Sequence, residues 1–294
     1  MVSSWLRRPI STAVGVLDER DPAFIARFID VVEPVLWRWF RPEVRGLERI
    51  PAGAALYVGN HSGGFATPDT WIFGAAVYRA RGIGDVPYGL GHSLVMESRW
   101  PGEALSRMGG LRATAENAHH AFVAGGKVLV YPGGDLDAFR ASRDRERVIF
   151  GPRRGYLRLA VREGVPIVPV VSAGAHDGFR ILSDGRWLAR LLPVKRILRT
   201  EVLPITLSFP WGLTVGAPPY VPVPTKILIE ALEPIRFERA GEEASRDDAY
   251  VEECHRRVID AMQGALERLS HERRRARDQR LVDRLGALAD ILER

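Results

Sequence analysis

A histidine and an acidic residue follow a short apolar run near the start of the chain. His61 comes after the run Ala54–Val58, and seven residues separate it from Asp69. The run predicts a strand, and the pair Thr67-Pro68 predicts that a helix starts just before Asp69. A carboxylate that accepts a hydrogen bond from an imidazole fixes its tautomer and strengthens the other ring nitrogen as a base. We therefore expect His61 to act as a general base with Asp69 as its partner.

Each of these two residues also has a structural explanation. A histidine at the end of a strand can satisfy backbone groups by hydrogen bonding. An acid in the first turn of a helix is favoured by the helix dipole alone. The neighbours of His61 favour the catalytic interpretation, because Ser62, Gly63 and Gly64 leave room for a substrate, and glycine lets backbone N–H groups point at an anion.

Two later segments could contribute to the same site. The apolar run Val128–Tyr131 leads into Pro132-Gly133-Gly134, a turn whose backbone donors could face the substrate. Farther on, Arg153 and Arg154 could hold a phosphate, although a solvated pair of arginines explains them equally well.

Strands and helices alternate through the middle of the chain, which predicts an α/β fold with a largely parallel central sheet flanked by helices. Two prolines within 166–171 predict an edge strand or a bulge there. The predicted strands are Ala54–Val58, Val86–Leu90, Lys127–Tyr131, Pro166–Val171 and Ile227–Ala231. The predicted helices are Asp69–Arg81, Pro101–Met108, Ala115–Ala124 and Tyr156–Glu163.

The two ends of the chain differ from the middle. Residues 1–45 predict an amphipathic helical segment, which would either pack on the core or lie in a membrane interface. Residues 46–240 hold the α/β domain, and residues 241–294 predict charged helices. An apolar stripe runs through the last segment at helical spacing and predicts a buried face. Its members are Val251, Cys254, Val258, Met262, Leu266 and Leu269.

Two apolar segments between residues 187 and 224 are interrupted by proline and glycine. Trp187–Pro193 and Leu203–Leu213 are too broken for a long helix. Two interpretations remain open: a buried irregular excursion, or a loop that dips into lipid or lines a pocket for an acyl chain.

The composition indicates a globular protein with an anionic partner. The chain has 294 residues, 46% of them hydrophobic, and a formal net charge of +6, which suits nucleic acid, a phospholipid surface or a phosphorylated substrate. Cys254 is the single cysteine, which excludes an intramolecular disulfide. The chain lacks the long apolar run of a signal peptide or a membrane span. We expect a cytoplasmic protein that lies on the inner face of the membrane.

Taken in order, these segments resemble the glycerolipid acyltransferase family, which is related to bacterial 1-acylglycerol-phosphate acyltransferases. The resemblance covers roughly residues 50 to 240. The family's first block is Asn-His, four residues and Asp. Asn60-His61 and Asp69 match it, but the longer spacing requires the inserted glycines to loop out. The second block usually carries an arginine that binds the phosphate of the acceptor, and Arg112 is the nearest match.

The third and fourth blocks narrow the resemblance. The family typically has Phe-Pro-Glu-Gly, whereas this chain has Tyr131–Gly134 without the glutamate. The branch that looks like diacylglycerol acyltransferases carries Phe-Pro-Gly-Gly, and its acceptor can be a neutral diglyceride. Val165–Val170 matches the fourth block closely, and Pro210–Leu213 also looks like that branch.

The resemblance implies direct acyl transfer without a metal, a cofactor or a covalent acyl-enzyme. His61, oriented by Asp69, would deprotonate a hydroxyl of a lysophospholipid or diglyceride, which attacks the thioester of acyl-CoA or acyl carrier protein. Backbone N–H groups near Gly133 and Gly134 would stabilise the oxyanion. The implied partners are acyl-CoA, a glycerolipid acceptor and an anionic membrane surface. The implied substrate-binding residues are Asn60, Ser62, Gly63, Gly64, Arg112, Gly133, Gly134 and Arg154.

Other functions also fit parts of the sequence. Gly91–Val95 resembles the nucleophile elbow of a serine lipase or esterase, with Ser93 as nucleophile and Asp177 and His255 as partners, although Val95 replaces a glycine. A non-catalytic protein that binds membrane lipids is a second alternative. Nucleic acid is disfavoured, because the arginines form no recognition motif and no aromatic residues interleave with them.

Overall fold

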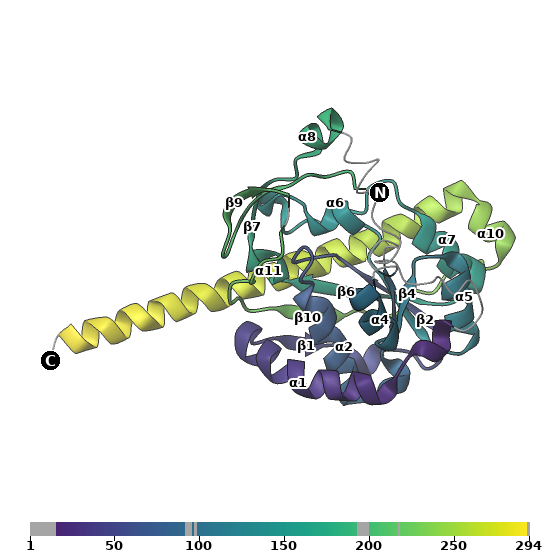
Figure 1. Ribbon diagram of the computed structural model, residues 1–294, viewed down its shortest axis with the longest axis horizontal. Helices are drawn as coiled ribbons and strands as arrows, with labels where there is room; N and C mark the ends of the chain where they lie inside the picture. Colours follow the sequence, from purple (N-terminus) through teal and green to yellow (C-terminus); the bar gives the residue numbers. More distant parts are fainter. Residues whose placement is uncertain (1–15, 92–95, 97–98, 193–199, 217, 293–294) are drawn as a thin grey trace.

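The computed structural model describes residues 16–91, 96, 99–192, 200–216 and 218–292, and two sheets lie within them. The larger sheet has the strand order β1-β10-β6-β2-β5-β3-β4, and the smaller has the order β7-β8-β9 (Figure 1). The strands are β1 Glu43–Arg45, β2 Ala55–Gly59, β3 Tyr88–Gly91, β4 Gly110–Arg112, β5 Lys127–Val130, β6 Ile167–Ala173, β7 Arg180–Ser183, β8 Ile205–Ser208, β9 Gly212–Val215 and β10 Leu228–Ala231. The helices are α1 Pro22–Phe40, α2 Pro68–Arg81, α4 Arg99–Arg107, α5 Ala115–Val123, α6 Gly134–Ala138, α7 Gly155–Glu163, α8 Arg186–Leu191, α10 Glu242–Arg246 and α11 Asp248–Leu292.

The larger sheet is parallel except where β10 runs antiparallel to β6. This confirms the predicted α/β class with a largely parallel sheet. In the centre, β2 pairs with β5 on one side and with β6 on the other. All five residues of β2 are buried, as expected for a parallel strand that is covered on both faces.

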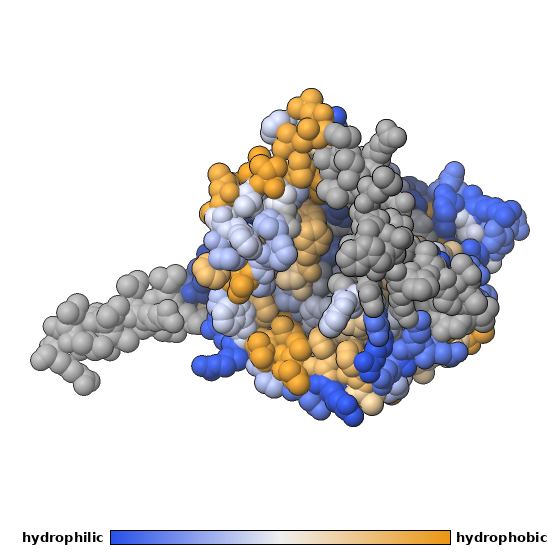
Figure 2. All heavy atoms as spheres, viewed as in Figure 1, coloured by the Kyte–Doolittle hydropathy of each residue, from blue (hydrophilic) through white to orange (hydrophobic). Residues whose placement is uncertain are grey.

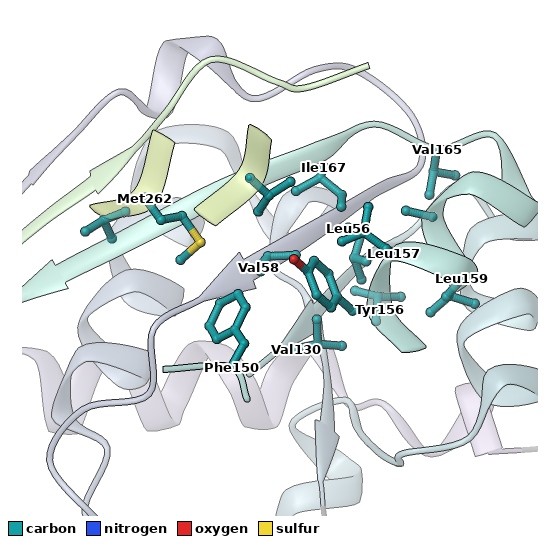
Figure 3. Packing of buried hydrophobic residues seen from close by; sticks show 14 of the residues in the cluster. Leu56, Val58, Val130, Phe150, Tyr156, Leu157, Leu159, Val165, Ile167 and Met262 are labelled. Carbon is teal, nitrogen blue, oxygen red and sulfur yellow. The ribbon is translucent and has the colours of Figure 1, made fainter. Parts of the chain in front are cut away.

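Helices cover both faces of this sheet, and successive residues of β2 point into opposite layers. Tyr57 packs with residues of α2, including Ile72 and Phe73. Leu56 and Val58 pack on the other side with α5, α7 and α11 (Figure 3). Each large apolar side chain buried in this way contributes about 1.5–3 kcal/mol relative to exposure, so the two layers fix the plane from which the strand ends emerge.

The strand β6 is central, although its prolines predicted an edge strand or a bulge. On its β10 side, Val170 lies opposite Ala231, and Ile167 pairs with Ile235. The partner segment therefore carries one extra residue, and this bulge lies beside Pro169. The alternative of an edge strand is wrong. Proline is tolerated here because the ladder is already interrupted where its missing N–H would donate.

Both end segments pack on the central layers. Asp21 caps α1 by accepting a hydrogen bond from Phe24 N at 2.9 Å, and the buried face of α1 contacts α2 through Ile25 and Ile29. The strand β1, which lies before residue 46, forms an edge of the main sheet. The predicted stripe on α11 is buried, and its Cys254 is a core residue.

The segment around 203–213 is more regular than its prolines and glycines suggest, because it contains β8 and β9. The pair forms an antiparallel hairpin that packs beside β7. Its apolar residues are not buried: the exposed fractions of Phe209 and Leu213 are both 66%. The interpretation as a buried irregular excursion is therefore wrong. The small sheet and α8 form a lobe with exposed apolar residues (Figure 2).

Candidate active site at the carboxyl edge of the sheet

The carboxyl ends of β2, β5 and β6 meet at one edge of the sheet because these three neighbouring strands are parallel. His61 follows β2, Tyr131 follows β5, and Ser172 lies near the end of β6. The fold therefore brings together the ends of the strands before His61 and Gly133, and it places the end of β6, which contains most of the fourth block, beside them. Ligands of open α/β sheets bind at this edge.

The peptide unit of His61 is held from both sides by a buried ion pair. Asp137 Oδ2 accepts a hydrogen bond from His61 N at 2.5 Å, and Arg140 Nη1 donates to the His61 carbonyl at 2.7 Å. Arg140 Nη1 also contacts Asp137 Oδ1 at 2.9 Å. The exposed side-chain fractions of Arg140 and Asp137 are 1% and 0%. The pair fixes the backbone of His61 while leaving its imidazole free to serve another function.

Asn60 and Ser62 hold the segment on either side of His61. Asn60 exchanges two hydrogen bonds with the backbone of Ser172: its Nδ2 donates to the carbonyl at 2.9 Å, and its Oδ1 accepts from the N–H at 2.8 Å. Ser62 Oγ accepts from Arg140 Nη2 at 3.2 Å. Both side chains are buried. These contacts position the loop, and they explain both residue types without a substrate.

The inserted glycines do form a loop between His61 and α2. Gly63 and Gly64 have φ angles of +76° and +54°, a backbone region that favours glycine. A Cβ on Gly63 would lie 2.9 Å from Pro68 Cδ, and one on Gly64 would lie 2.8 Å from the Phe179 ring. Both glycines are buried, whereas Phe65 points outward. The close packing of this loop requires glycine at both positions.

The imidazole of His61 is partly exposed, but its Nδ1 is buried and has no hydrogen-bond partner among the described residues. The ring lies 4.7 Å from that of Tyr131, measured between centroids. Burial, with the positive charge of Arg140 as a second cause, lowers the pKa of His61 from 6.5 to about 4. The imidazole is therefore neutral at physiological pH, which is the state that a general base needs.

Asp69 lies at the start of α2 and is 3% exposed. Its Oδ1 accepts from Thr70 N at 3.1 Å, whereas its Oδ2 is buried without a partner among the described residues. Burial raises the pKa of this carboxyl from 3.8 to about 7. No hydrogen bond joins Asp69 to His61 in this part of the structure. The sequence thus selected two of the residues whose buried polar atoms lack partners, a group that also includes Arg140 and Ser172. The structure does not pair His61 with Asp69.

Tyr131 connects the surroundings of His61 and Asp69. Its ring packs against His61 at an interplanar angle of 44°, and its hydroxyl shares a 2.6 Å hydrogen bond with Thr70 Oγ1, next to Asp69. A Cβ on Gly59 would lie 2.4 Å from the Tyr131 ring, so β2 must carry glycine where this ring crosses it. Burial, reinforced by the negative charge of Asp69, raises the pKa of Tyr131, which keeps its hydroxyl protonated.

The turn after β5 is close-packed, and one of its backbone N–H groups already has an acceptor within the turn. Gly134 N donates to the carbonyl of Tyr131 at 3.0 Å, which leaves Gly133 as the better candidate for an oxyanion donor. Arg153 reaches the same turn, with Nη1 2.5 Å from the Gly133 carbonyl and Nη2 2.6 Å from Asp135 Oδ1. Arg153 therefore contacts the turn in place of its neighbour Arg154.

The other two arginines lie away from His61. Arg154 forms an ion pair with Glu252 of α11 at 2.6 Å and donates to the carbonyl of Gly151 at 2.8 Å. These contacts join α7 to α11 and explain Arg154 without a phosphate. Arg112 ends the edge strand β4, which β5 and β3 separate from β2. The structure places Arg112 at the carboxyl edge but does not bring it next to His61.

The serine-hydrolase alternative gains no support from the described residues. Ser93 lies outside them. Asp177 forms an ion pair with Arg273 at 3.0 Å, and His255 Nδ1 shares a 2.9 Å hydrogen bond with the hydroxyl of Tyr156. Each proposed partner of Ser93 is thus held by a different residue.

Sequence reasoning missed the residues that support the site. Asp137 lies three residues after the third block, where an acid after a turn is expected at a helix start. Arg140 follows three positions later, a spacing that permits an ion pair on a helix. Neither pattern indicates that the pair is buried against the peptide of His61, because that contact depends on the pairing of β2 with β5.

Comparisons with known proteins identify the family and the fold. A model of the Acyltransferase family matches residues 41–173. An uncharacterised protein of Mycobacterium tuberculosis is 32% identical over 93% of this chain and 74% of its own length. A mouse protein described as "DGAT1/2-independent enzyme synthesizing storage lipids" is 27% identical over 66% of this chain and 56% of its own. The crystal structure of the 1-acyl-sn-glycerophosphate (LPA) acyltransferase PlsC from Thermotoga maritima has a TM-score of 0.52 at 17% identity, covering 83% of this chain and 79% of that one.

Proposed function

Because this chain belongs to the acyltransferase family, we propose that it transfers a fatty acyl group from acyl-CoA or acyl carrier protein to a hydroxyl of a lysophospholipid or a diglyceride. One observation carries the proposal. His61 is partly exposed at the carboxyl edge of the sheet, its peptide is clamped by a buried ion pair, and its Nδ1 has no partner among the described residues. Such a histidine is positioned for a reaction and has no structural hydrogen bond that would explain it.

In the proposed mechanism, His61 Nε2 removes the proton from the acceptor hydroxyl as its oxygen attacks the thioester carbonyl. The new C–O bond produces a tetrahedral oxyanion, and the N–H of Gly133 is the candidate donor to it. One such donor is worth about 3–4 kcal/mol. The C–S bond then breaks, and the imidazolium returns its proton to the thiolate of the leaving group. Residues of the chain supply every proton transfer in this scheme, with no metal, cofactor or acyl-enzyme.

Asp69 is the proposed partner of the imidazolium. Its unpaired Oδ2 and the unpaired Nδ1 of His61 are complementary, since a protonated Nδ1 donates and a carboxylate accepts. A positive charge on His61 would lower the pKa of Asp69 below the value of about 7 that burial imposes. The two residues would thus form their hydrogen bond as the proton moves, when it stabilises the transition state most.

We propose that the acceptor is a glycerolipid. Support comes from two similar proteins, one named as a 1-acyl-sn-glycerophosphate acyltransferase and the other as an enzyme synthesising storage lipids. The third block, Tyr131–Gly134, has the Gly-Gly of the branch with diglyceride acceptors. A diglyceride therefore fits this block at least as well as a lysophospholipid.

We further propose that the protein works on the inner face of the membrane. Within the described part of the chain, no helix combines the length and hydropathy needed to cross a bilayer. The lobe of β7, β8, β9 and α8 instead exposes large apolar side chains, as Figure 2 shows, and among them Trp187 and Trp211 are both 56% exposed. Tryptophan favours the interface between lipid and water. An exposed apolar lobe on a basic protein fits an anionic lipid surface.

The test is to incubate the pure full-length protein with mixed acyl-CoAs and a panel of lysophospholipids and diglycerides, and to identify the products by mass spectrometry. Parallel reactions with acyl carrier protein as donor, and reactions without donor, complete the design. We expect one class of acceptor to gain an acyl chain only when donor is present. If no acceptor gains an acyl chain from either donor, the proposed function is wrong.

A further inference from the structure

A cationic cavity of about 530 Å³ lies between the middle of α11 and the start of β7. Loop 142–146, the segment 224–226 and the residue after α1 complete its walls. It is separate from the carboxyl-edge residues described above and has no role in the proposed proton transfers. Its lining is Arg41, Ser142, Arg145, Glu146, Asp177, Phe179, Arg180, Pro224, Thr225, Lys226, Ser270, Arg273, Arg274 and Arg277.

The charges in this lining do not balance. Seven of its residues are basic and two, Glu146 and Asp177, are acidic. The acids are already engaged: Asp177 accepts from Arg273 at 3.0 Å and lies 3.5 Å from Arg145 Nε, and Glu146 pairs with Arg274. The cavity therefore keeps a surplus of positive charge, which its own acidic residues do not neutralise.

Two of the arginines have no partner within the described part of the chain. Arg41 follows α1, and Arg180 begins β7. Both are exposed, and neither guanidinium group donates a hydrogen bond or joins an ion pair there. Arg273, by contrast, is fixed by Asp177, by Thr225 Oγ1 at 3.0 Å and by the carbonyl of Lys226 at 2.8 Å. A fixed cationic wall and two free guanidinium groups form an arrangement suited to phosphate, which arginine binds through its planar fork of donors.

One rim of the cavity continues into the exposed apolar face of the small sheet. Arg180 lies opposite Leu207 in the pairing of β7 with β8, and Leu207 lies opposite Leu213 in β9. Side chains in register on neighbouring strands share a face. This row thus runs from a cation that lines the cavity to two leucines that are 49% and 66% exposed. The combination matches an amphiphile with a phosphate group and a hydrocarbon chain.

The cavity is also close to the loop that carries His61. Phe179 lines the cavity, and its ring would lie 2.8 Å from a Cβ on Gly64. Phe179 stacks on Tyr220 at 4.3 Å, and the hydroxyl of Tyr220 donates to the carbonyl of Gly63. A single aromatic layer therefore separates the cationic cavity from the glycines that follow His61.

We infer that this cavity binds the phosphate groups of an amphiphile. That amphiphile is either the acyl donor of the reaction or a lipid of the membrane on which the protein lies. The choice of amphiphile rests on the proposed acyl transfer, whereas the phosphate chemistry rests on the cavity itself. The same chemistry could come from the phosphates of coenzyme A or from the headgroup of an anionic phospholipid. The experiment below distinguishes these two sources.

The test uses full-length protein carrying His61→Ala, so that binding is measured without turnover. Two probes are used: coenzyme A by calorimetry, and co-sedimentation with phosphatidylcholine vesicles with or without phosphatidylglycerol. The test variant adds Arg41→Ala and Arg180→Ala. We expect a loss of at least tenfold in affinity for coenzyme A, for vesicles with phosphatidylglycerol, or for both, because each variant arginine removes charge-assisted hydrogen bonds to phosphate. A loss for coenzyme A identifies the donor's phosphates, and a loss confined to the vesicles identifies a headgroup.

The matched control replaces Arg256 and Arg257 by alanine. These arginines are exposed on α11 and lie outside the cavity lining, and their guanidinium groups donate no hydrogen bond to a described residue. The two control substitutions remove the same net charge as the test substitutions. We expect the affinities for coenzyme A and for the vesicles to stay within about twofold of those of the His61→Ala protein. Equal losses in both double variants, or no loss in the cavity variant, would overturn the inference, as would a protein that binds neither probe. Failure of acyl transfer by the wild-type protein would leave these binding results unchanged, so the two proposals fail separately.

Discussion

The carboxyl edge of the main sheet and the small three-stranded sheet depart from ordinary burial in opposite ways. At the edge, His61 Nδ1 and Asp69 Oδ2 are among the polar atoms that are buried without partners in the described residues. On the small sheet, Leu213 and Val215 are apolar and more than half exposed. Folded proteins normally pair buried polar groups and avoid large apolar patches.

This contrast separates a reacting site from a contact surface. An unpaired buried polar atom costs about 1–3 kcal/mol of folding free energy. At the edge, this cost is recovered when a substrate or a transferred proton gives the atom a hydrogen-bond partner. An exposed apolar side chain costs the isolated fold little, and it becomes favourable only when another apolar phase covers it. Substitutions should therefore affect activity and stability at the edge, and binding alone on the small sheet.

Among the substitutions that compare these two regions, the largest effect is expected from Asp69→Asn. Losing the carboxylate should slow acyl transfer by roughly 10²–10⁴-fold. The same variant should be more stable at pH 8. Burial raises the folded pKa of Asp69 to about 7, above the unfolded value near 3.9, so the native state loses stability as pH rises from about 4 to 7. Asparagine removes this loss of up to about 4 kcal/mol above pH 7 and changes nothing below pH 4.

Steady-state kinetics and urea unfolding at pH 4 and pH 8 on one preparation measure both effects. An unchanged rate, or a variant that is less stable than the wild type at pH 8, would show that Asp69 is an ordinary helix-start residue. Because its pKa is lowered to about 4, His61 is neutral at pH 8 but partly protonated at pH 4, so the rate comparison is made at pH 8.

The next effect concerns the clamp on the His61 peptide. Asp137→Ala leaves Arg140 buried without its carboxylate, which should lower the free energy of unfolding by about 3–5 kcal/mol. The control is Asp144→Ala, whose ion pairs with Arg143 and Arg147 lie at the surface and should cost less than about 1 kcal/mol. Similar losses for the two variants in urea unfolding would mean that the clamp does not hold the site.

A smaller effect is expected on the small sheet. Val215→Ser should weaken partitioning to vesicles of phosphatidylcholine and phosphatidylglycerol by about threefold to tenfold, since burying one valine side chain contributes about 1.5 kcal/mol. Val123→Ser is the matched control, because Val123 of α5 is also exposed but lies outside the lobe. Both variants should unfold as the wild type does. Equal partitioning of the two variants would argue that the small sheet does not contact lipid.

The smallest effect is expected from Arg154→Ala. Its ion pair with Glu252 is partly exposed, and removing it should cost about 1 kcal/mol or less. The KM for both substrates should stay within about twofold of the wild-type value. A tenfold rise in KM for either substrate would restore Arg154 to the substrate site, where sequence analysis placed it.

The sequence was sufficient for elements with a clear periodic pattern. Predicted strands such as Lys127–Tyr131 and helices such as Asp69–Arg81 agree with β5 and α2 to within a residue or two. Each of these segments has a local signal, either a short apolar run or a capped helix start, and local signals do not depend on the rest of the fold. The order of the blocks along the chain also gave the family correctly.

The parts of the fold and of the site that the sequence did not predict depend on contacts between residues that are distant in the chain. The hairpin β8–β9 was missed because its prolines and glycines disrupt the strand pattern, while pairing with β7 stabilises it. The Asp137–Arg140 clamp arises from the neighbouring positions of β2 and β5. The assignment of Arg154 to the substrate rested on residue type alone, and only the structure places Glu252 beside it.

The central claim is that His61 is the general base of an acyl transfer. The most direct test is the rate of transfer from acyl-CoA to the identified acceptor by purified His61→Ala protein, after circular dichroism and urea unfolding show that it is folded. We predict that the rate falls by roughly 10²–10⁴-fold relative to the wild type. Transfer at a near-normal rate by the folded variant would contradict the account.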